Sequence, residues 1–334
     1  MTLPETMRLV RAEQLGPVEN YVLVEMPLVP PGPGEVLVRM HATSLGFADV
    51  LVTTGLYQVK PPVPFVPGSE GSGEVAAVGA GVSGWAVGDR VCITRFSGGL
   101  GEYVLAQPAE LHPFPRGLSF LEAAIYRVNY ATMLHALKDR ALVQPGETLL
   151  VLGAAGGVGT AAVQLGKLMG ARVIAGASTA AKREFARSLG ADEVLDYSVD
   201  NWRDALKALT GGRGVDVVAD PVGGKLFEPA FRSLAWKGRH IVIGFAGGDI
   251  PRLPANLPLL KGAALIGADI RQFGIYEPEL ADANAAQIVR WCESGLRPPV
   301  GPVFDFTRYR EAMTAASAGQ SLGKVVVQIT DPSD

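Results

Sequence analysis

The stretch that decides the fold is Leu149-Leu150-Val151-Leu152-Gly153-Ala154-Ala155-Gly156-Gly157-Val158-Gly159. Its apolar beginning predicts a buried strand, and its end predicts the start of a helix within a βαβ unit. Glycine lets the backbone turn sharply and approach a pyrophosphate without an intervening Cβ atom. The helix starting near Gly157 points free N–H groups and its positive dipole end at the phosphates. This context favours a dinucleotide site over an ordinary strand–turn–helix connection, with contacts from Ala155, Gly156, Gly157, Val158 and Gly159.

Strands and helices alternate after this motif. Short apolar runs predict strands at 172–177, 193–195, 215–219, 240–244 and 263–268. Helical spacing lies between them at 157–169, 181–189, 202–209 and 226–234. Alternation of this kind is typical of a doubly wound parallel sheet covered by helices on both faces, an α/β fold. We expect 263–268 to lie at the edge of that sheet.

The two ends of the chain have a different pattern. Before residue 120 the sequence predicts short strands at 8–11, 21–25, 35–42, 71–78, 89–94 and 102–106, separated by turn-forming residues. Residues 121–138 have helical spacing, and the tail predicts helices at 278–294 and 309–318 and a strand at 324–329.

Composition excludes several classes of protein. The chain has 334 residues, of which 48% are hydrophobic and 19% charged, enough for about two domains with buried cores. A net charge of −3 with both signs interspersed gives no basic surface for nucleic acid or anionic lipid. No apolar run reaches the ~18 residues that cross a bilayer, and no secretory signal is visible. We expect a cytoplasmic protein.

The end of the second predicted strand indicates which nicotinamide cofactor binds. NAD sites usually carry an acidic residue there for the ribose 2′-hydroxyl. This chain has Gly176-Ala177-Ser178-Thr179 instead, and its first acid is Glu184. The Ser178 hydroxyl and the Lys182 ammonium can hold a 2′-phosphate, which predicts NADPH. In the alternative interpretation, Lys182 and Arg183 only form a solvated helix face.

Several motifs together carry a family resemblance. The chain resembles the quinone oxidoreductases of the medium-chain dehydrogenase/reductase superfamily in Gly55-Leu56-Tyr57, Pro67–Gly73, Val87–Val91, Gly153–Gly159, Leu189–Asp192, Gly211–Asp216, Asp220–Gly224, Gly238–Gly244 and Gly323-Lys324. The resemblance implies a Rossmann domain at 126–270 and a mostly β, GroES-like catalytic domain at 1–125, to which the chain returns at 271–334. It also implies a homodimer.

The same resemblance implies roles for single residues. Thr132, Tyr197, Phe245, Gly323 and Lys324 match cofactor-contacting positions. The candidates for binding the electron acceptor are Leu51, Tyr57, Arg127 and Asn129, and the candidates for catalysis are Arg127 and Thr132.

The metal ligands of zinc-dependent relatives are missing. Those proteins carry a cysteine where this chain has Thr43-Ser44-Leu45-Gly46, and a histidine where it has Gly68-Ser69-Glu70. The four histidines and two cysteines show no metal-ligand spacing. We expect no metal site.

The acceptor site departs from the family pattern. Asparagine, tyrosine and arginine are replaced by Gly46, Leu51 and Thr53, and a family proline is missing from the segment Ile125-Tyr126-Arg127. In one interpretation, Arg127 supplies positive charge to the acceptor site. In the other, Arg127 is structural and either points to solvent or pairs with a carboxylate such as Glu122. The leading interpretation is NADPH-dependent hydride transfer to a quinone. The alternatives are an ene-reductase of α,β-unsaturated carbonyls or acrylate-like acids, and an NADPH-binding protein with little catalysis.

Overall fold

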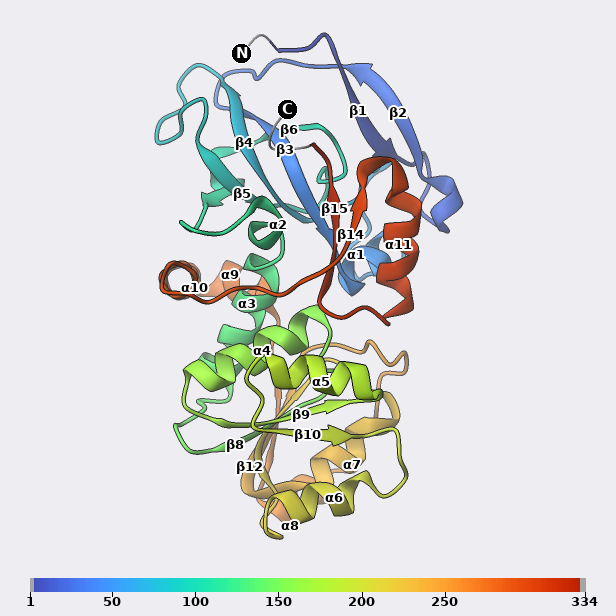
Figure 1. Cartoon of the computed structure of the whole chain (residues 1–334), viewed down its shortest axis with the longest axis vertical. Coiled ribbons are helices and arrows are strands. Elements are labelled where there is room, and N and C mark those ends of the chain that lie inside the picture. The colour runs from blue at the N-terminus through green and yellow to red at the C-terminus, as the bar shows by residue number, and fades with distance from the viewer. Residues whose placement is uncertain (1–2, 331–334) are drawn as a thin grey trace. The chain divides into compact units, whose positions relative to one another are not determined.

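The computed structural model describes residues 3–330 and divides into two compact units, Met1–Val128 with Gln287–Asp334, and Asn129–Ala286 (Figure 1). The sequence-based boundaries lay at 125 and 270. Helix α9 (Ile270–Tyr276) and the first part of α10 (Pro278–Glu293) belong to the second unit. The Phe273 ring stacks on His135 at 3.8 Å, and Asn284 donates to Asp139, which holds both helices there.

The second unit contains a six-stranded parallel sheet, which confirms the doubly wound fold. Its strands follow the spatial order β10-β9-β8-β11-β12-β13. The chain moves outward from β8 to β10 and then resumes on the other side of β8, as in dinucleotide-binding folds. The strands are β8 (Thr148–Val151), β9 (Arg172–Ala177), β10 (Glu193–Asp196), β11 (Val215–Asp220), β12 (Leu234–Val242) and β13 (Ala264–Gly267).

Helices cover both faces of this sheet. Figure 1 shows α4 and α5 on one side of the strands and α6 and α7 on the other. The fit of α4 depends on glycine, because a Cβ atom at Gly166 would lie 2.8 Å from Leu149 Cδ2 and 3.0 Å from Val173 Cγ2. The helices are α4 (Gly157–Leu168), α5 (Ala180–Ser188), α6 (Trp202–Leu209), α7 (Phe227–Arg232) and α8 (Asn256–Lys261).

The first unit is mostly β and includes the C-terminal tail. Its larger sheet has the order β14-β15-β3-β4-β5-β7, with β6 also paired to β3, and β1 and β2 form a separate pair. Tail strand β15 runs antiparallel to β3. The strands are β1 (Thr6–Arg11), β2 (Val22–Pro27), β3 (Val36–Leu45), β4 (Glu70–Val78), β5 (Arg90–Thr94), β6 (Tyr103–Ala106), β7 (Leu111–Pro113), β14 (Val300–Asp305) and β15 (Lys324–Gln328). The unit also contains α1 (Phe47–Thr53) and α11 (Tyr309–Ala318).

Some sequence-based elements were wrong in detail. Residues 121–138 form α2 (Phe120–Ala123), α3 (Arg127–Leu134) and a π-helix at His135–Arg140. The buried Tyr126 lies between α2 and α3, and its hydroxyl donates to the Pro113 carbonyl. Strand β12 begins at Leu234, six residues earlier than expected. A positive φ of 64° at Lys237 and an irregular register hide its beginning in the sequence pattern.

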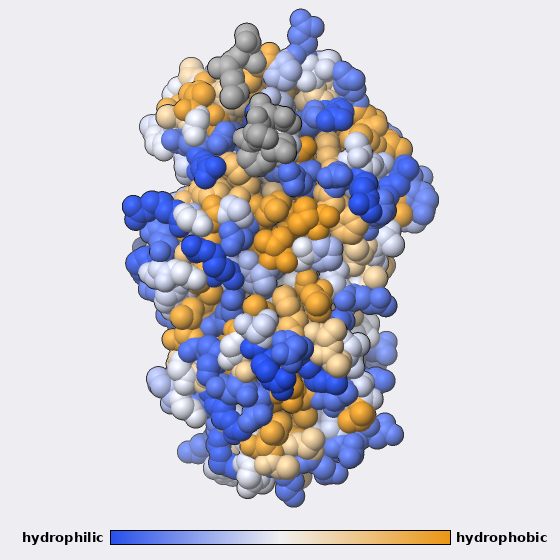
Figure 2. Space-filling view, in the orientation of Figure 1, coloured by the Kyte–Doolittle hydropathy of each residue, from blue (hydrophilic) through white to orange (hydrophobic). Residues whose placement is uncertain are grey.

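Exposed residues are of mixed character. On the face in Figure 2, hydrophobic patches lie between hydrophilic residues on both units. Within residues 3–330, none of the helices is long and apolar enough to cross a membrane.

Candidate functional site

Several predicted site residues lie together at the carboxyl ends of the parallel strands. Because β8, β9, β11 and β12 are parallel, the loops that follow them leave from the same edge of the sheet. These loops contain the glycine-rich segment after β8, Ser178 after β9, the turn 221–224 after β11, and Phe245 after β12.

The glycine-rich loop ends in an uncapped helix. Gly156 is the N-cap of α4 and provides no side-chain bond, and the first turn contains no acid. The first helical bond runs from Thr160 N to Gly156 O at 2.8 Å. The N–H groups of Gly157, Val158 and Gly159 come before that bond and so have no acceptor within the helix. Helices that bind anions use N–H groups of this kind.

Two glycines of this loop are required by geometry. Gly153 has a φ of 62°. At Gly159, a Cβ atom would lie 2.1 Å from the Gly153 carbonyl oxygen, so only glycine lets α4 start this close to the end of β8. The loop therefore fits a pyrophosphate by its own geometry.

The end of β9 lacks an acid, as the sequence indicated. Thr179 caps α5, with its side chain accepting from Lys182 N at 3.3 Å, and Ser178 and Lys182 are both half-buried. The nearby acid Asp196 forms an ion pair with Arg183 at 2.8 Å. Hydrogen bonds from Ser198, together with Arg183, hold the pKa of the Asp196 carboxyl below its usual range. Arg183 is thus engaged with Asp196.

Tyr197 packs beside the glycine-rich loop. A Cβ atom at Gly176 would lie 3.0 Å from Tyr197 Cδ1, so the ring lies against the backbone of β9. Burial raises the pKa of Tyr197, and a hydrogen bond from the Gly153 backbone partly opposes this.

A second group of contacts joins the loops after β11 and β12. A Cβ atom at Gly223 would lie 3.0 Å from Phe245 Cδ1, and Ala246 N donates to Pro221 O at 3.1 Å. On α3, Asn129 and Thr132 are buried, and the adjacent Tyr130 hydroxyl donates to Gln164 of α4.

The first unit contains a buried ion pair that the sequence did not reveal. Lys324 Nζ donates to Glu70 Oε2 at 2.5 Å, and the two side chains are 7% and 1% exposed. Glu70 Oε1 accepts from Val128 N at 2.9 Å, in the first turn of α3. The structure therefore places the Lys324 ammonium on a carboxylate. Gly323 forms the preceding turn with a φ of 77°.

Gly46 and Ser69, from the two stretches in which no metal ligand was expected, surround another carboxylate. Asp49 Oδ2 accepts from Gly46 N at 2.8 Å, and its Oδ1 accepts from the Ser69 hydroxyl at 2.7 Å. Glycine at position 46 also makes room for Lys324, because a Cβ atom there would lie 3.3 Å from Lys324 Cε. Residues 3–330 contain no group of three or more His, Cys, Asp or Glu side chains arranged to hold a metal ion.

The acceptor-binding candidates Leu51, in α1, and Tyr57, after α1, lie close together. Tyr57 N donates to Leu51 O at 2.9 Å, and both side chains are half-buried. The Tyr57 ring lies 6.2 Å from that of Phe96, so this part of the unit is aromatic and apolar.

Arg127 does not pair with Glu122. Ser119 occupies that carboxylate in a capping box, and no carboxylate in the described part of the chain forms an ion pair with Arg127. Burial and then the charge of Arg127 lower the pKa of His112 to about 3, which places the guanidinium near β7. The half-buried Arg127 side chain therefore lies near β7 without a carboxylate partner among residues 3–330.

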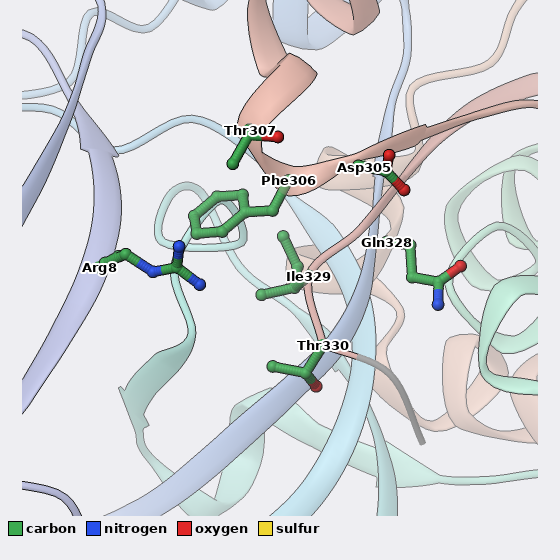
Figure 3. Close-up of a pocket in the computed structure, with 7 residues that line it drawn as sticks. All are labelled: Arg8, Asp305, Phe306, Thr307, Gln328, Ile329 and Thr330. Carbon is green, nitrogen blue, oxygen red and sulfur yellow. The ribbon is translucent and has the colours of Figure 1, made fainter. Parts of the chain in front are cut away.

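A separate pocket on the first unit contains none of these residues (Figure 3). Its cation, Arg8, forms an ion pair with Glu102 at 2.6 Å, and its guanidinium lies 5.9 Å from the Phe306 ring centre. We assign this pocket no role in catalysis.

Comparisons with known proteins match both units. Residues 157–285 match the family model described as zinc-binding dehydrogenase, and residues 32–116 match the alcohol dehydrogenase GroES-like domain. Quinone oxidoreductase-like protein 2 of Rattus norvegicus is 38% identical over 302 residues, covering 90% of this chain and 86% of its own length.

Solved structures agree with this match. The quinone oxidoreductase of Thermus thermophilus, whose structures include an NADPH complex, has a TM-score of 0.82 at 35% identity, covering 96% of this chain and 100% of its own. The CurK enoyl reductase has a TM-score of 0.86 at 27% identity, with 97% and 99% coverage.

We predict that Lys324→Met destabilises the protein by about 3–5 kcal/mol, because it leaves the Glu70 carboxylate buried without its cation. Chemical denaturation of the purified protein measures this change. The double variant Glu70→Gln/Lys324→Met removes both charges and should recover at least half of the loss. Equal stability of wild type and Lys324→Met would contradict a buried ion pair.

Proposed function

The chain belongs to the quinone oxidoreductase-like family of the medium-chain dehydrogenase/reductase superfamily, and we propose that it transfers hydride from NADPH to a quinone without a metal. The observation that carries this proposal is the glycine-rich loop after β8, whose uncapped helix start suits a dinucleotide. The stretches Thr43–Gly46 and Gly68–Glu70, moreover, contain neither the cysteine nor the histidine that zinc-dependent relatives are expected to carry there.

Each part of the cofactor has candidate contacts on the second unit. The backbone of Ala155, Gly156, Gly157, Val158 and Gly159 would hold the pyrophosphate. Ser178 and Lys182 would hold the 2′-phosphate, with Tyr197 beside the adenosine half. Phe245 and Thr132 would orient the nicotinamide. When bound, NADPH supplies the hydride.

A quinone suits a site without a Lewis acid. A zinc ion would polarise a carbonyl, whereas a quinone already accepts electrons and needs mainly orientation. The half-buried Leu51 and Tyr57 side chains provide an apolar surface for its ring, and water or a nearby hydroxyl would supply the proton.

We predict that the purified enzyme oxidises NADPH with a quinone faster than with an enal or an acrylate, and that chelation leaves this rate unchanged. Absorbance at the nicotinamide band follows the reaction, and elemental analysis of the same sample measures bound zinc. About one zinc per chain with loss of the rate on chelation would contradict the metal-free mechanism. Absence of turnover with all three acceptors would instead favour an NADPH-binding protein with little catalysis.

We predict that Lys182→Glu weakens NADPH binding at least tenfold and changes NADH binding less than threefold, because a carboxylate would repel the 2′-phosphate. Fluorescence titration with each cofactor measures the two affinities. The exposed Lys207 on α6 offers a matched control, since Lys207→Glu makes the same charge change away from the loops. Equal losses for NADPH and NADH would show that Lys182 does not select the phosphate.

An ene-reductase is the alternative that a specific observation favours. Arg127 has no carboxylate partner within the described residues and can meet an acid group or a developing enolate. The structural similarity to an enoyl reductase supports the same chemistry.

If Arg127 binds the acceptor, Arg127→Ala should lower kcat/KM at least about tenfold, equivalent to roughly 1.4 kcal/mol, with NADPH affinity nearly unchanged. Arg127→Lys keeps the charge and should retain more of the rate. Steady-state kinetics with a quinone and an acrylate measure both variants. A loss below threefold with either acceptor would leave Arg127 a structural role and favour apolar contacts to a quinone.

We also propose a homodimer joined through β13. This strand is the edge of the parallel sheet, and Leu265 on it is 44% exposed, with Trp236, Leu259 and Leu260 of the same unit more exposed still. An exposed apolar edge favours pairing with a second copy about a twofold axis.

We predict a dimeric mass by light scattering at micromolar concentration and a monomeric mass for Leu265→Lys, which places a charge on the pairing edge. Leu168→Lys, on α4, changes a similarly exposed leucine away from that edge and should leave the dimer intact. A monomeric wild type would contradict the proposal.

A further inference from the structure

We propose that the buried Asp220–His240 pair is a positioning device that holds the nicotinamide end of the cofactor site in shape. The proposal rests on the cofactor site argued above. It adds a role for two residues that lie behind the site and are too deeply buried to touch the cofactor.

The pair lies inside the second unit on neighbouring strands. His240 Nε2 is 2.9 Å from Asp220 Oδ2, and the side chains are 0% and 1% exposed. The rings of Phe227 and Phe231 lie 4.6 and 6.0 Å from the imidazole. A carboxylate in such apolar surroundings is costly unless hydrogen bonds compensate it, so each of its bonds matters.

The other oxygen of Asp220 holds a turn. Oδ1 accepts from Val222 N and from Gly223 N, both at 2.8 Å. Both carboxylate oxygens are therefore fixed. His240 holds Oδ2 inside the sheet, and two backbone N–H groups hold Oδ1 at the carboxyl end of β11. Because His240 fixes the rotation of the carboxyl group, Oδ1 stays directed at the turn.

This turn contacts the parts of the loops assigned to the cofactor. A Cβ atom at Gly153 would lie 2.9 Å from Val222 Cγ2, so the valine packs on the first glycine of the dinucleotide loop. Val222 O accepts from Gly247 N at 2.7 Å. Gly223, with a φ of 65°, lies against Phe245. A shift of the turn would move Phe245, which is assigned to the nicotinamide, whereas Gly153 stays fixed by the position of α4 against β8.

The hydrogen-bonding pattern also limits what His240 can do. Its Nδ1 is buried without a partner, whereas Nε2 faces the carboxylate. The ring proton therefore belongs on Nε2, because a proton on Nδ1 would be a buried donor without an acceptor. His240 has no path to a substrate, so it acts through Asp220 and is not an acid or base of the reaction.

The test compares two ligands that share the adenosine half. We expect His240→Leu to weaken NADPH binding at least tenfold and to change adenosine 2′,5′-bisphosphate binding less than twofold, because the bisphosphate lacks the nicotinamide. His240→Gln keeps a donor toward Asp220 and should restore most of the NADPH affinity. Calorimetric titration without any acceptor measures each affinity.

A matched control separates positioning from general destabilisation. His135 is a similarly buried histidine of the same unit, 3.2 Å from Asp139, but it bonds within the π-helix. His135→Leu should leave the affinities for both ligands within twofold of wild type. If His240→Leu loses affinity for NADPH and for the bisphosphate equally, or loses none, the proposal is overturned.

A milder variant keeps the proposal testable if His240→Leu does not fold. Asp220→Asn retains an oxygen for the turn but turns the group that faces His240 into a donor. This variant should weaken NADPH binding at least threefold and leave bisphosphate binding unchanged. Equal losses of affinity for the two ligands, or no loss, would again overturn the proposal. A wild type that binds NADPH but reduces no quinone contradicts the proposed function only.

Discussion

The structure of the second unit depends on the close approach of α4 to the sheet. Gly159 lies where a Cβ atom would be 2.1 Å from the Gly153 carbonyl, and Gly166 lies where one would contact Leu149 and Val173. Protein interiors are packed densely, so any larger side chain at these positions would push the helix outward. The same approach brings the start of α4 to the end of β8, where its free N–H groups can meet a phosphate. Packing and the candidate binding site thus follow from the same glycines.

Buried carboxylates organise the backbone around the candidate site residues. Asp49 accepts from Gly46 N and from Ser69, Glu70 accepts from Val128 N and Lys324, and Asp220 accepts from two N–H groups and His240. In each case the acid satisfies backbone donors that a loop or a helix start would otherwise leave unpaired. A site that binds a nicotinamide cofactor needs such rigid loops, because the protein contributes mainly orientation and electrostatics.

The sequence predicted features that depend on local pattern and missed those that depend on distant partners. The strand, turn and helix around the glycine-rich loop and the parallel strands were predicted correctly, because buried strands and close turns leave a direct mark on residue type. The break near Tyr126 was missed, and the bond from the Tyr126 hydroxyl to Pro113, 13 residues earlier, is not indicated by the local pattern. Lys324 and Glu70 are 254 residues apart, so nothing local indicates their ion pair. For His240 the sequence indicated only that it lacks metal-ligand spacing, and the register of β11 and β12 is what brings it to Asp220.

The central claim is that a nicotinamide cofactor binds at the carboxyl edge of the parallel sheet. Hydrogen–deuterium exchange with and without NADPH tests this claim without requiring turnover, because bound phosphates protect the amides that they contact. The account predicts slower exchange at residues 155–160, at the turn 221–224 and near Phe245, with little change in β1 and β2. Absence of protection at 155–160 under saturating NADPH, or protection confined to the first unit, would contradict it.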